Sequence, residues 1–229
     1  MKERIRHTVI LAAGRGQRLM PATNYLPKAM LPFLQSTLVA TGIDKIRPHI
    51  DNIHVTVGYK GAMLASHLIE HDVTSIHNTD GKTNSWWIHN TLLRCIDEPV
   101  FVLTCDNVTD IDFAELAADY FGLGAPPCLL VPVEPVAGLD GDYIFHDGPV
   151  VTKLSRSEQA PTYASGIQVL NPARVAAMTS GDGDFGDIWR ELIAQRQLYV
   201  SRVKPEKWYS VDTLEHLELC AQLMGSPAQ

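Results

Sequence analysis

The sequence has few of the features that mark a secreted or membrane-spanning protein. Its four cysteines show no C-x-x-C spacing, so neither a zinc site nor a disulfide framework is predicted. No apolar run approaches the length of a membrane span. The start, Met1-Lys2-Glu3-Arg4, lacks the apolar segment of a signal peptide. We therefore expect a cytoplasmic protein with no membrane partner.

Positive charge is also scarce. The formal net charge of -7 argues against nucleic acid as a partner, because proteins that bind it generally carry a basic face. An anionic small molecule could still bind where basic residues gather locally and a divalent metal helps. The 229 residues are 45% hydrophobic and 20% charged, which is enough for one sizeable core. A single domain over residues 1–229 is the expectation.

The strongest local signal lies in residues 9–33. An apolar run ends in small residues and passes into a loop with Gly14 and Gly16, which is typical of a buried strand followed by a phosphate-binding loop. Arg18 and Lys28 supply the positive charge that a triphosphate needs. The proline before Lys28 restricts the backbone, so the lysine is presented on a defined path.

The rest of the chain alternates between strand and helix patterns, which predicts a doubly wound α/β domain. In the first half, helices are expected at 34–46, 60–70 and 86–96, the last capped by Ser85, and strands at 53–57, 73–76 and 100–103. In the second half, helices are expected at 112–121, 173–178, 185–195 and 213–224, strands at 128–133, 167–170 and 198–203, a hairpin with arms at 143–145 and 150–151, and a short extended piece at 208–209.

Two aspartates are candidate metal ligands. Asp106 follows a buried apolar run, so it should emerge at the carboxyl end of a central strand, where open α/β sheets bind their ligands. Asp212 follows a short extended stretch and opens a helix. Magnesium usually takes one or two carboxylates plus substrate phosphates. The alternatives are a turn at Asp106-Asn107 and a helix N-cap at Asp212.

The pattern Leu-Ala-Ala-Gly-x-Gly-x-Arg, followed by Pro-x-Thr and Pro-Lys, resembles the N-terminal signature of the nucleotidyltransferases that make nucleotide-activated sugars and alcohols, the NDP-sugar pyrophosphorylase type. The Rossmann fingerprint is not met, because Leu19 occupies its third glycine position, and the Walker A pattern is absent. The resemblance implies a Rossmann-like, GT-A-type fold with three α/β/α layers and a mostly parallel sheet. It also implies a nucleotide-binding half, 1–110, and an acceptor-binding half, 111–229.

The same resemblance implies roles for these residues. A phosphorylated acceptor would attack the α-phosphorus of a nucleoside triphosphate, and pyrophosphate would leave. Arg18 would bind the leaving pyrophosphate, Lys28 would neutralise the α-phosphate, and Asp106 and Asp212 would hold Mg²⁺, since the family carries one such aspartate after the central strand and one before the C-terminal helix. Backbone groups of the loop would bind the nucleotide, at Leu11, Ala12, Ala13, Gly14, Arg15 and Gly16.

The chain departs from the sugar-activating pattern in three places. The Gln and Gly-Thr-Ala of that pattern are replaced in residues 77–85, its Glu-Lys-Pro lysine is missing at residues 158–161, and no glycine separates Asp212 from Thr213. An Asn, a short polar spacer and Thr-Asn before a helix are similar to bacterial cytidylyltransferases that activate phosphocholine. This similarity favours CTP as the triphosphate, with a sugar 1-phosphate or an alcohol phosphate such as phosphocholine as the acceptor.

On that reading, Asn78, Asn84 and Ser85 are candidates for binding the base or the acceptor, although a solvated loop with an Asx-turn explains such residues equally well. Trp86 at a helix start could place its ring against an ammonium group or a base. The alternative for Trp86 is packing in the core.

Further acceptor-side candidates lie in the second half. Lys153 could replace the missing lysine, as could Lys204 or Lys207, although basic residues in such places usually lie on solvated surface. Tyr163 and Gly166 lie where the acceptor-side strand of the family carries its glycine.

The sequence thus predicts a Mg²⁺-dependent nucleotidyltransferase. The alternative is a nucleotide-binding regulatory protein of the same fold that has lost catalysis, which the missing acceptor-side lysine suggests. A molybdopterin-type guanylyltransferase shares the Leu-Ala-Ala-Gly start, but we would then expect a shorter path to Gly-x-Asp-Lys. The sequence leaves the oligomeric state open.

Overall fold

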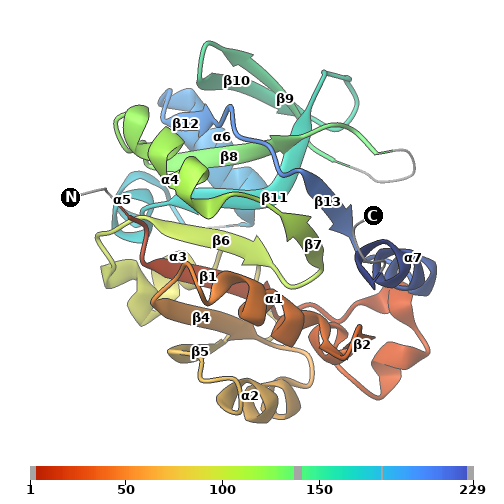
Figure 1. Ribbon diagram of the computed structural model, residues 1–229. Helices are drawn as coiled ribbons and strands as arrows, with labels where there is room; N and C mark the ends of the chain where they lie inside the picture. Colours follow the sequence, from red (N-terminus) through yellow and green to blue (C-terminus); the bar gives the residue numbers. More distant parts are fainter. Residues whose placement is uncertain (1–3, 137–140, 182, 226–229) are drawn as a thin grey trace.

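The computed structural model describes residues 4–136, 141–181 and 183–225. A nine-stranded sheet runs through the molecule in the order β5-β4-β1-β6-β11-β8-β12-β10-β9, with helices on both of its faces (Figure 1). Its strands are β1 (His7–Ala12), β4 (Asn52–Val57), β5 (Ser75–Asn78), β6 (Val100–Thr104), β8 (Cys128–Val133), β9 (Tyr143–Asp147), β10 (Val150–Ser155), β11 (Tyr163–Leu170) and β12 (Leu198–Val200).

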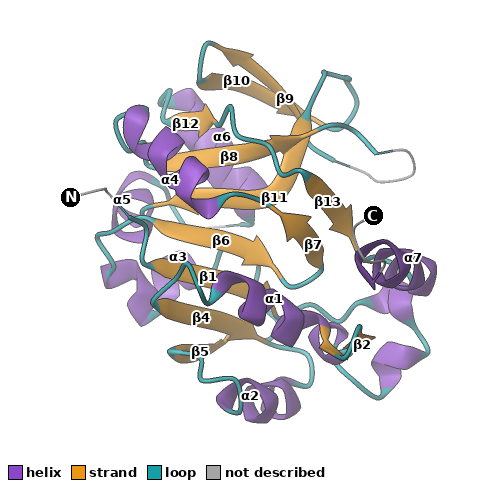
Figure 2. Ribbon diagram, in the orientation of Figure 1, coloured by secondary structure: helices purple, strands orange, loops and turns teal. Residues whose placement is uncertain are grey.

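Two apolar cores, one on each face of the sheet, make the three layers seen in Figure 2. The helices α1 (Leu38–Ile46), α2 (Gly61–Ile69) and α4 (Phe113–Gly122) contribute to one core. The helices α3 (Trp87–Asn90), α5 (Pro172–Met178) and α6 (Phe185–Ala194) contribute to the other. The apolar run of β6 explains this arrangement, because Phe101 and Leu103 enter the first core whereas Val100 and Val102 enter the second.

The sheet combines a parallel part with a mixed part, in which β8 and β12 pair in parallel and the other neighbours are antiparallel. Strands β5, β4, β1 and β6 pair in parallel, as the strand-helix alternation of the first half predicts. Strand β11 then joins β6 in antiparallel fashion, with Val102 opposite Gln168, and β8 follows it. The predicted three-layer α/β/α fold with a Rossmann-like core is confirmed.

A separate two-stranded ribbon pairs β7 (Asn107–Asp110) with β13 (Lys207–Ser210). The sequence analysis predicted the extended piece at 208–209 but not its partner. The chain turns at Cys105 and Asp106 and enters β7 at once. In the ribbon, Ser210 pairs with Asn107, and the Val211 N–H donates to the Asp106 carbonyl at 3.0 Å. This pairing brings the residues that follow β13 close to Asp106.

Two helix predictions of the first half were wrong in their extent. The helix expected at 34–46 starts only at Leu38, because residues before it form a small hairpin, β2 (Pro32–Phe33) and β3 (Ser36–Thr37), and Thr37 caps α1 by accepting from the Ala40 N–H. The helix expected at 86–96 is divided into α3 and the 3₁₀ helix η4 (Leu92–Cys95), because Thr91 is extended and caps η4 instead.

Other boundaries shifted for local reasons. Ser85 does not cap α3, since its hydroxyl donates to the Gly183 carbonyl at 3.1 Å. Strand β5 starts two residues later than predicted, at Ser75. The last helix, α7 (Leu214–Gly225), packs against the segment after the phosphate-binding loop (Figure 1). Within the part of the chain that the structure describes, no helix is long and apolar enough to cross a membrane.

Candidate active site

A cleft of about 510 Å³ opens at the carboxyl ends of β1 and β6. From β1 the chain first adds β4 and β5 on one side and then returns to place β6 on the other, so β1 lies at the topological switch point where such sheets bind ligands. The cleft is lined by Leu11, Gly14, Arg15, Gly16, Gln17, Arg18, Lys28, Asn84, Thr104, Cys105, Asp106 and Asp212.

Of the two glycines in the loop after β1, only Gly16 has a left-handed backbone, and Gly14 does not. Gly16 has a φ of +64°, and a Cβ built on it would lie 2.9 Å from Cβ of Lys28. Any side chain at this position would therefore be strained and would displace the lysine. The buried Thr23 hydroxyl donates to the Gly16 carbonyl at 3.0 Å and fixes the loop from below.

Lys28 lies between the two aspartates. Its Nζ is 2.6 Å from Asp106 Oδ2 and 3.4 Å from Asp212 Oδ1, and only 10% of its side chain is exposed. Burial alone would lower the pKa of the ammonium group, but the charge and hydrogen bond of Asp106, helped by Asp212, raise it above its ordinary value. Lys28 is therefore a permanent positive charge in the floor of the cleft.

Asp212 also receives Arg18, from the 3₁₀ helix η1 (Gln17–Leu19), whose guanidinium lies 3.0 Å from the same Oδ1. The Arg18 side chain is 69% exposed, so it can reorient toward a bound anion. The Ser210 hydroxyl donates to the other oxygen, Oδ2, at 3.2 Å. Asp212 was alternatively expected to cap the last helix. The side chain that does so is Thr213, whose Oγ1 accepts from the His216 N–H of α7.

The donor set of the cleft suits a hard divalent cation only in part. In the described ranges, no group of three or more His, Cys, Asp or Glu side chains is arranged to hold a metal ion. The two converging carboxylates are the number that magnesium takes from a protein when substrate phosphates complete its shell. Asp106 and Asp212, which both pair with Lys28, are therefore the side chains that could hold a magnesium ion arriving with a nucleotide.

Among the candidates for binding the base, the structure brings Asn84 to the cleft but not its neighbours. The Asn84 Oδ1 accepts from the N–H of Phe185, the first residue of α6, at 3.0 Å. Ser85 is buried and does not line the cleft. Asn78 forms an Asx-turn with the Asp80 N–H at 3.0 Å and does not line the cleft. Trp86 is half-buried outside the cleft lining, with Lys82 Nζ 5.6 Å from its ring centroid.

Tyr163 and Gly166 lie on β11 beside the ribbon. Tyr163 is buried, and its ring centroid is 5.8 Å from that of Trp208. Gly166 has a φ of +85°, and a Cβ there would lie 3.1 Å from the Asn107 amide nitrogen. Asn107 Nδ2 and Trp208 Nε1 both donate to the Ser165 carbonyl, at 2.8 and 3.0 Å, which fixes the ribbon to the main sheet. Neither Tyr163 nor Gly166 lines the cleft itself.

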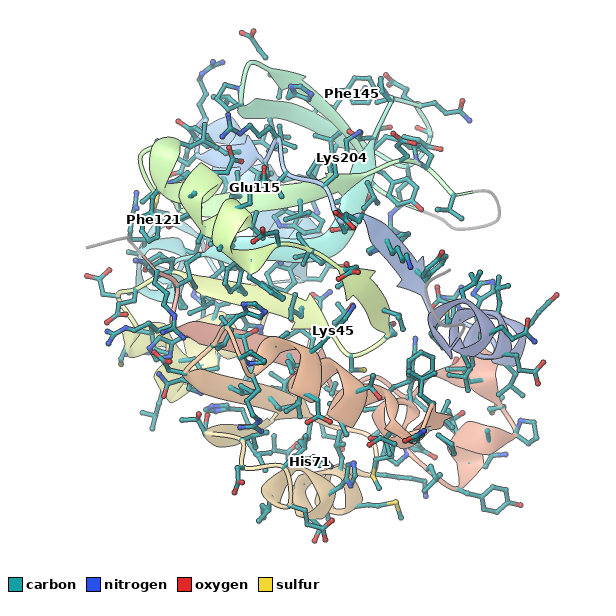
Figure 3. All side chains as sticks on the ribbon, viewed as in Figure 1. Lys45, His71, Glu115, Phe121, Phe145 and Lys204 are labelled. Atoms are coloured by element: carbon teal, nitrogen blue, oxygen red, sulfur yellow. The ribbon has the colours of Figure 1, made fainter. Side chains whose placement is uncertain are left out.

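The lysines suggested as substitutes lie elsewhere. Lys153, on β10, forms an ion pair with Glu158, and its Nζ is 5.4 Å from the Phe145 ring centroid. The Nζ of Lys204 lies 3.5 Å from Oε1 of Glu134. Figure 3 shows Phe145 and Lys204 in the upper part of the molecule, near the β9–β10 hairpin and away from β1. The third candidate, Lys207, is the first residue of β13. The structure brings none of the three lysines into the cleft lining.

A model of the MobA-like NTP transferase domain family matches residues 8–132. The chain belongs to this family. Among its relatives, the N-acetylmuramate alpha-1-phosphate uridylyltransferase of Caulobacter vibrioides is 25% identical over 215 residues, which cover 86% of this chain and 88% of the relative. The CTP:phosphoglutamine cytidylyltransferase of Campylobacter jejuni is 31% identical over 99 residues, 40% of this chain and 39% of that protein.

Several relatives are much longer than the match. The aligned part is 18% of the length of the bifunctional protein GlmU of Methanococcus aeolicus, which is 38% identical over 73 residues, 31% of this chain. It is 49% of the length of the mannose-1-phosphate guanyltransferase of Debaryomyces hansenii, which is 25% identical over 180 residues, 72% of this chain. The chain therefore spans less than half of these two proteins.

Solved structures confirm the fold. The crystal structure of apo UDP-glucose pyrophosphorylase superposes with a TM-score of 0.75 at 15% identity, covering 96% of this chain and 98% of that one. The inositol-1-phosphate CTP transferase of T. maritima superposes with a TM-score of 0.73 at 14% identity, covering 100% of both chains. At these identities the likeness concerns the fold alone.

Proposed function

We propose that this protein is a nucleotidyltransferase that transfers a nucleoside monophosphate from a nucleoside triphosphate to a small phosphorylated acceptor and releases pyrophosphate. The observation that carries the proposal is the convergence of Lys28 and Arg18 with Asp106 and Asp212 at the end of the glycine loop. These side chains come from four separate segments. Family membership supports the same reaction class.

The roles follow from position and charge. Transfer of a nucleotidyl group needs little covalent work from the protein, so placement and charge neutralisation dominate. Lys28, buried and protonated, lies in the cleft floor, where it can neutralise the α-phosphate. Arg18, exposed at the rim, can leave Asp212 for the pyrophosphate. The acceptor phosphate is already an anion at neutral pH, so no general base is needed.

Mg²⁺ belongs to the proposal as the ion that Asp106 and Asp212 would hold together with the phosphates of the nucleotide. When bound, it would supply further neutralisation of the phosphate charge. The same two carboxylates form ion pairs with Lys28 and Arg18.

CTP is the triphosphate that we propose. The Asn-spacer-Thr-Asn segment supports it, as does the similarity to a protein named as a CTP:phosphoglutamine cytidylyltransferase. For the acceptor we propose a sugar 1-phosphate or an alcohol phosphate. The first is supported by the uridylyltransferase of Caulobacter vibrioides, whose name gives a sugar α-1-phosphate and whose match extends over most of this chain.

The test is pyrophosphate release with Mg²⁺, in which four nucleoside triphosphates are crossed with sugar 1-phosphates, phosphocholine and polyol phosphates. We expect release that requires CTP and one acceptor. Asp106→Asn should lower turnover by about 10²-fold or more, as loss of a central electrostatic group does. Asp110→Asn is the matched control, since Asp110 lies four residues along on β7 and pairs with Lys45 outside the cleft lining.

Other outcomes separate the alternatives. Tight binding of a triphosphate with no release for any acceptor would favour the catalytically inactive nucleotide-binding protein. Release that depends on another triphosphate would overturn the choice of CTP but keep the reaction. Near-normal turnover by Asp106→Asn would remove Asp106 from the proposed metal site.

A further inference from the structure

A tyrosine at the end of β4 contacts the phosphate-binding loop from outside the cleft. The loop leaves β1 beside β4, and the N–H of Tyr59 donates to the Ala13 carbonyl at 3.1 Å. The preceding residue, Gly58, is buried against the same carbonyl: a Cβ built on it would lie 2.7 Å from the Ala13 oxygen. This close approach holds the backbone of Tyr59 in a fixed place against the start of the loop.

The side chain of Tyr59 makes two further contacts with the nucleotide-binding segment. Its hydroxyl donates to the Thr23 carbonyl at 2.9 Å, and the Thr23 hydroxyl in turn donates to the Gly16 carbonyl at 3.0 Å. Its ring receives Arg15, whose Cζ lies 5.2 Å from the ring centroid. Arg15 itself lines the cleft. Tyr59 therefore contacts the start of the loop at Ala13, the segment that follows the loop at Thr23, and the charged side chain of Arg15.

We infer that Tyr59 is a positioning residue for the triphosphate. Its ring holds the exposed guanidinium of Arg15 at the rim of the cleft, and its hydroxyl holds the loop beneath. Tyr59 does not line the cleft. The inference rests on the proposed function, because Arg15 can serve an anion only if the cleft binds one.

The physical reason is the mobility of an exposed arginine. Its long side chain samples many rotamers, and each must be given up when the guanidinium binds a phosphate. A cation over an aromatic face is held in place before the ligand arrives. At an exposed site this contact changes a binding constant by about 2- to 5-fold, which is the effect to look for.

The Tyr59 ring also has Lys60 Nζ 5.5 Å from its centroid, but Lys60 does not line the cleft. The contacts of the side chain with Thr23 and with Arg15 can be separated by substitution. Tyr59→Phe removes the hydrogen bond to Thr23 but keeps the ring beside Arg15, so it should lower the melting temperature and leave triphosphate affinity within about 2-fold. Tyr59→Leu removes both contacts and should weaken binding by a further 2- to 5-fold. Because the contact acts on bound triphosphate in general, KM should rise while kcat stays nearly constant.

A double-mutant cycle with Arg15→Ala tests the route of the effect. Binding of CTP and of inorganic triphosphate, which has the phosphates but no base, is measured by calorimetry for the wild type, Tyr59→Leu, Arg15→Ala and the double variant. We expect Tyr59→Leu to have no effect on affinity once Arg15 is gone. The control is Tyr25→Leu, since Tyr25 is 75% exposed and lies outside the cleft lining. Additive losses would overturn the inference and leave Tyr59 a purely structural residue.

A second readout separates this inference from the proposed function. In NMR spectra without nucleotide, the Arg15 side-chain protons should show a ring-current shift that is kept in Tyr59→Phe and lost in Tyr59→Leu. If that shift is present but the wild type binds neither CTP nor inorganic triphosphate, the proposed function fails. If triphosphate binds but the shift or the coupling is missing, the positioning role of Tyr59 fails while the proposed function stands.

Discussion

Gly16 and Lys28 show how closely the backbone and the charge of the site depend on each other. The loop turns at Gly16 with a positive φ, and the space that a side chain would need is taken by the stem of Lys28. The lysine in turn is held by Asp106 and Asp212. A side chain at position 16 should therefore shift Lys28, and the shift should disturb its ion pairs with Asp106 and Asp212.

We predict that Gly16→Ala impairs function more than stability. The left-handed backbone should cost about 1–2 kcal/mol of unfolding free energy. The new Cβ, 2.9 Å from Cβ of Lys28, should also displace the lysine and weaken triphosphate binding. Gly148→Ala is the matched control, because Gly148 has a φ of +54° with nothing within 4 Å of its Cβ position. Urea unfolding and calorimetry measure the two effects; equal losses of affinity in both variants would contradict the contact with Lys28.

Residue types allowed the charged part of the site to be predicted, but not its surroundings. Gly16, Lys28 and Asp106 follow local patterns that a strand and a loop impose, so their positions could be read from the sequence. Asn84 and Ser85 could not be resolved in the same way, because their partners, Phe185 and Gly183, lie about a hundred residues away. Nothing in the local sequence shows that these polar side chains are used to join two segments.

At the scale of elements, the β7–β13 ribbon decides the geometry of the site. Its pairing places Asp212 beside Asp106, although the two lie in different halves of the chain. Lys45 of α1 also donates to the ribbon, at the Thr109 carbonyl at 2.6 Å, and Figure 3 shows it beneath β7. Side-chain hydrogen bonds thus fix the ribbon both to the main sheet, through Asn107 and Trp208, and to α1, through Lys45.

We predict that Trp208→Phe loosens this attachment. The variant keeps an aromatic ring against Tyr163 but loses the Nε1 hydrogen bond to the Ser165 carbonyl. The free energy of unfolding should fall by about 0.5–1.5 kcal/mol, the contribution of one hydrogen bond, because Asn107 still donates to the same carbonyl. We expect turnover to fall by about 2- to 10-fold while triphosphate affinity changes less, measured by pyrophosphate release and calorimetry. Unchanged turnover with lowered stability would show that the attachment supports the fold alone.

The ribbon is also the element that sequence reasoning missed. Helices and buried strands can be recognised by local apolar periodicity, and the sequence predicted the bounds of most of them to within a few residues. Strand β7 has only four residues and its partner is far along the chain, so no local pattern marks it. The split at Thr91 was missed for a related reason, because the apolar residues on either side fit one continuous helix until the cap is seen.

At the scale of the molecule, the cleft lies at the carboxyl rim of a sheet that is covered by apolar cores on both faces. Polar side chains interrupt these apolar surfaces on β1, β4 and β5. His7 Nδ1 of β1 lies 3.1 Å from His54 Nε2 of β4, and Ser75 Oγ of β5 lies 2.7 Å from both His54 Nδ1 and His77 Nε2. A row of polar side chains therefore crosses three strands of the sheet.

Burial lowers the pKa of each histidine in this row, and the neighbouring rings help to lower that of His54 to about 4. In the unfolded chain the same residues take up a proton near pH 6.5. Between about pH 4 and 6.5 the unfolded chain binds more protons than the folded one. The free energy of unfolding therefore rises with pH across this range, and above it these histidines cause no further change. Acid should therefore destabilise the whole sheet through these strands.

We predict that the free energy of unfolding falls as the pH drops from about 6.5 toward 4, by up to about 1.4 kcal/mol per pH unit for each proton taken up. Urea unfolding at a series of pH values measures the slope. His54→Leu removes the most strongly shifted ring, so its slope should be shallower than that of the wild type by up to one proton. His146→Gln, on the exposed end of β9, should keep the wild-type slope. If His54→Leu kept it as well, the acid sensitivity would have to reside in other groups.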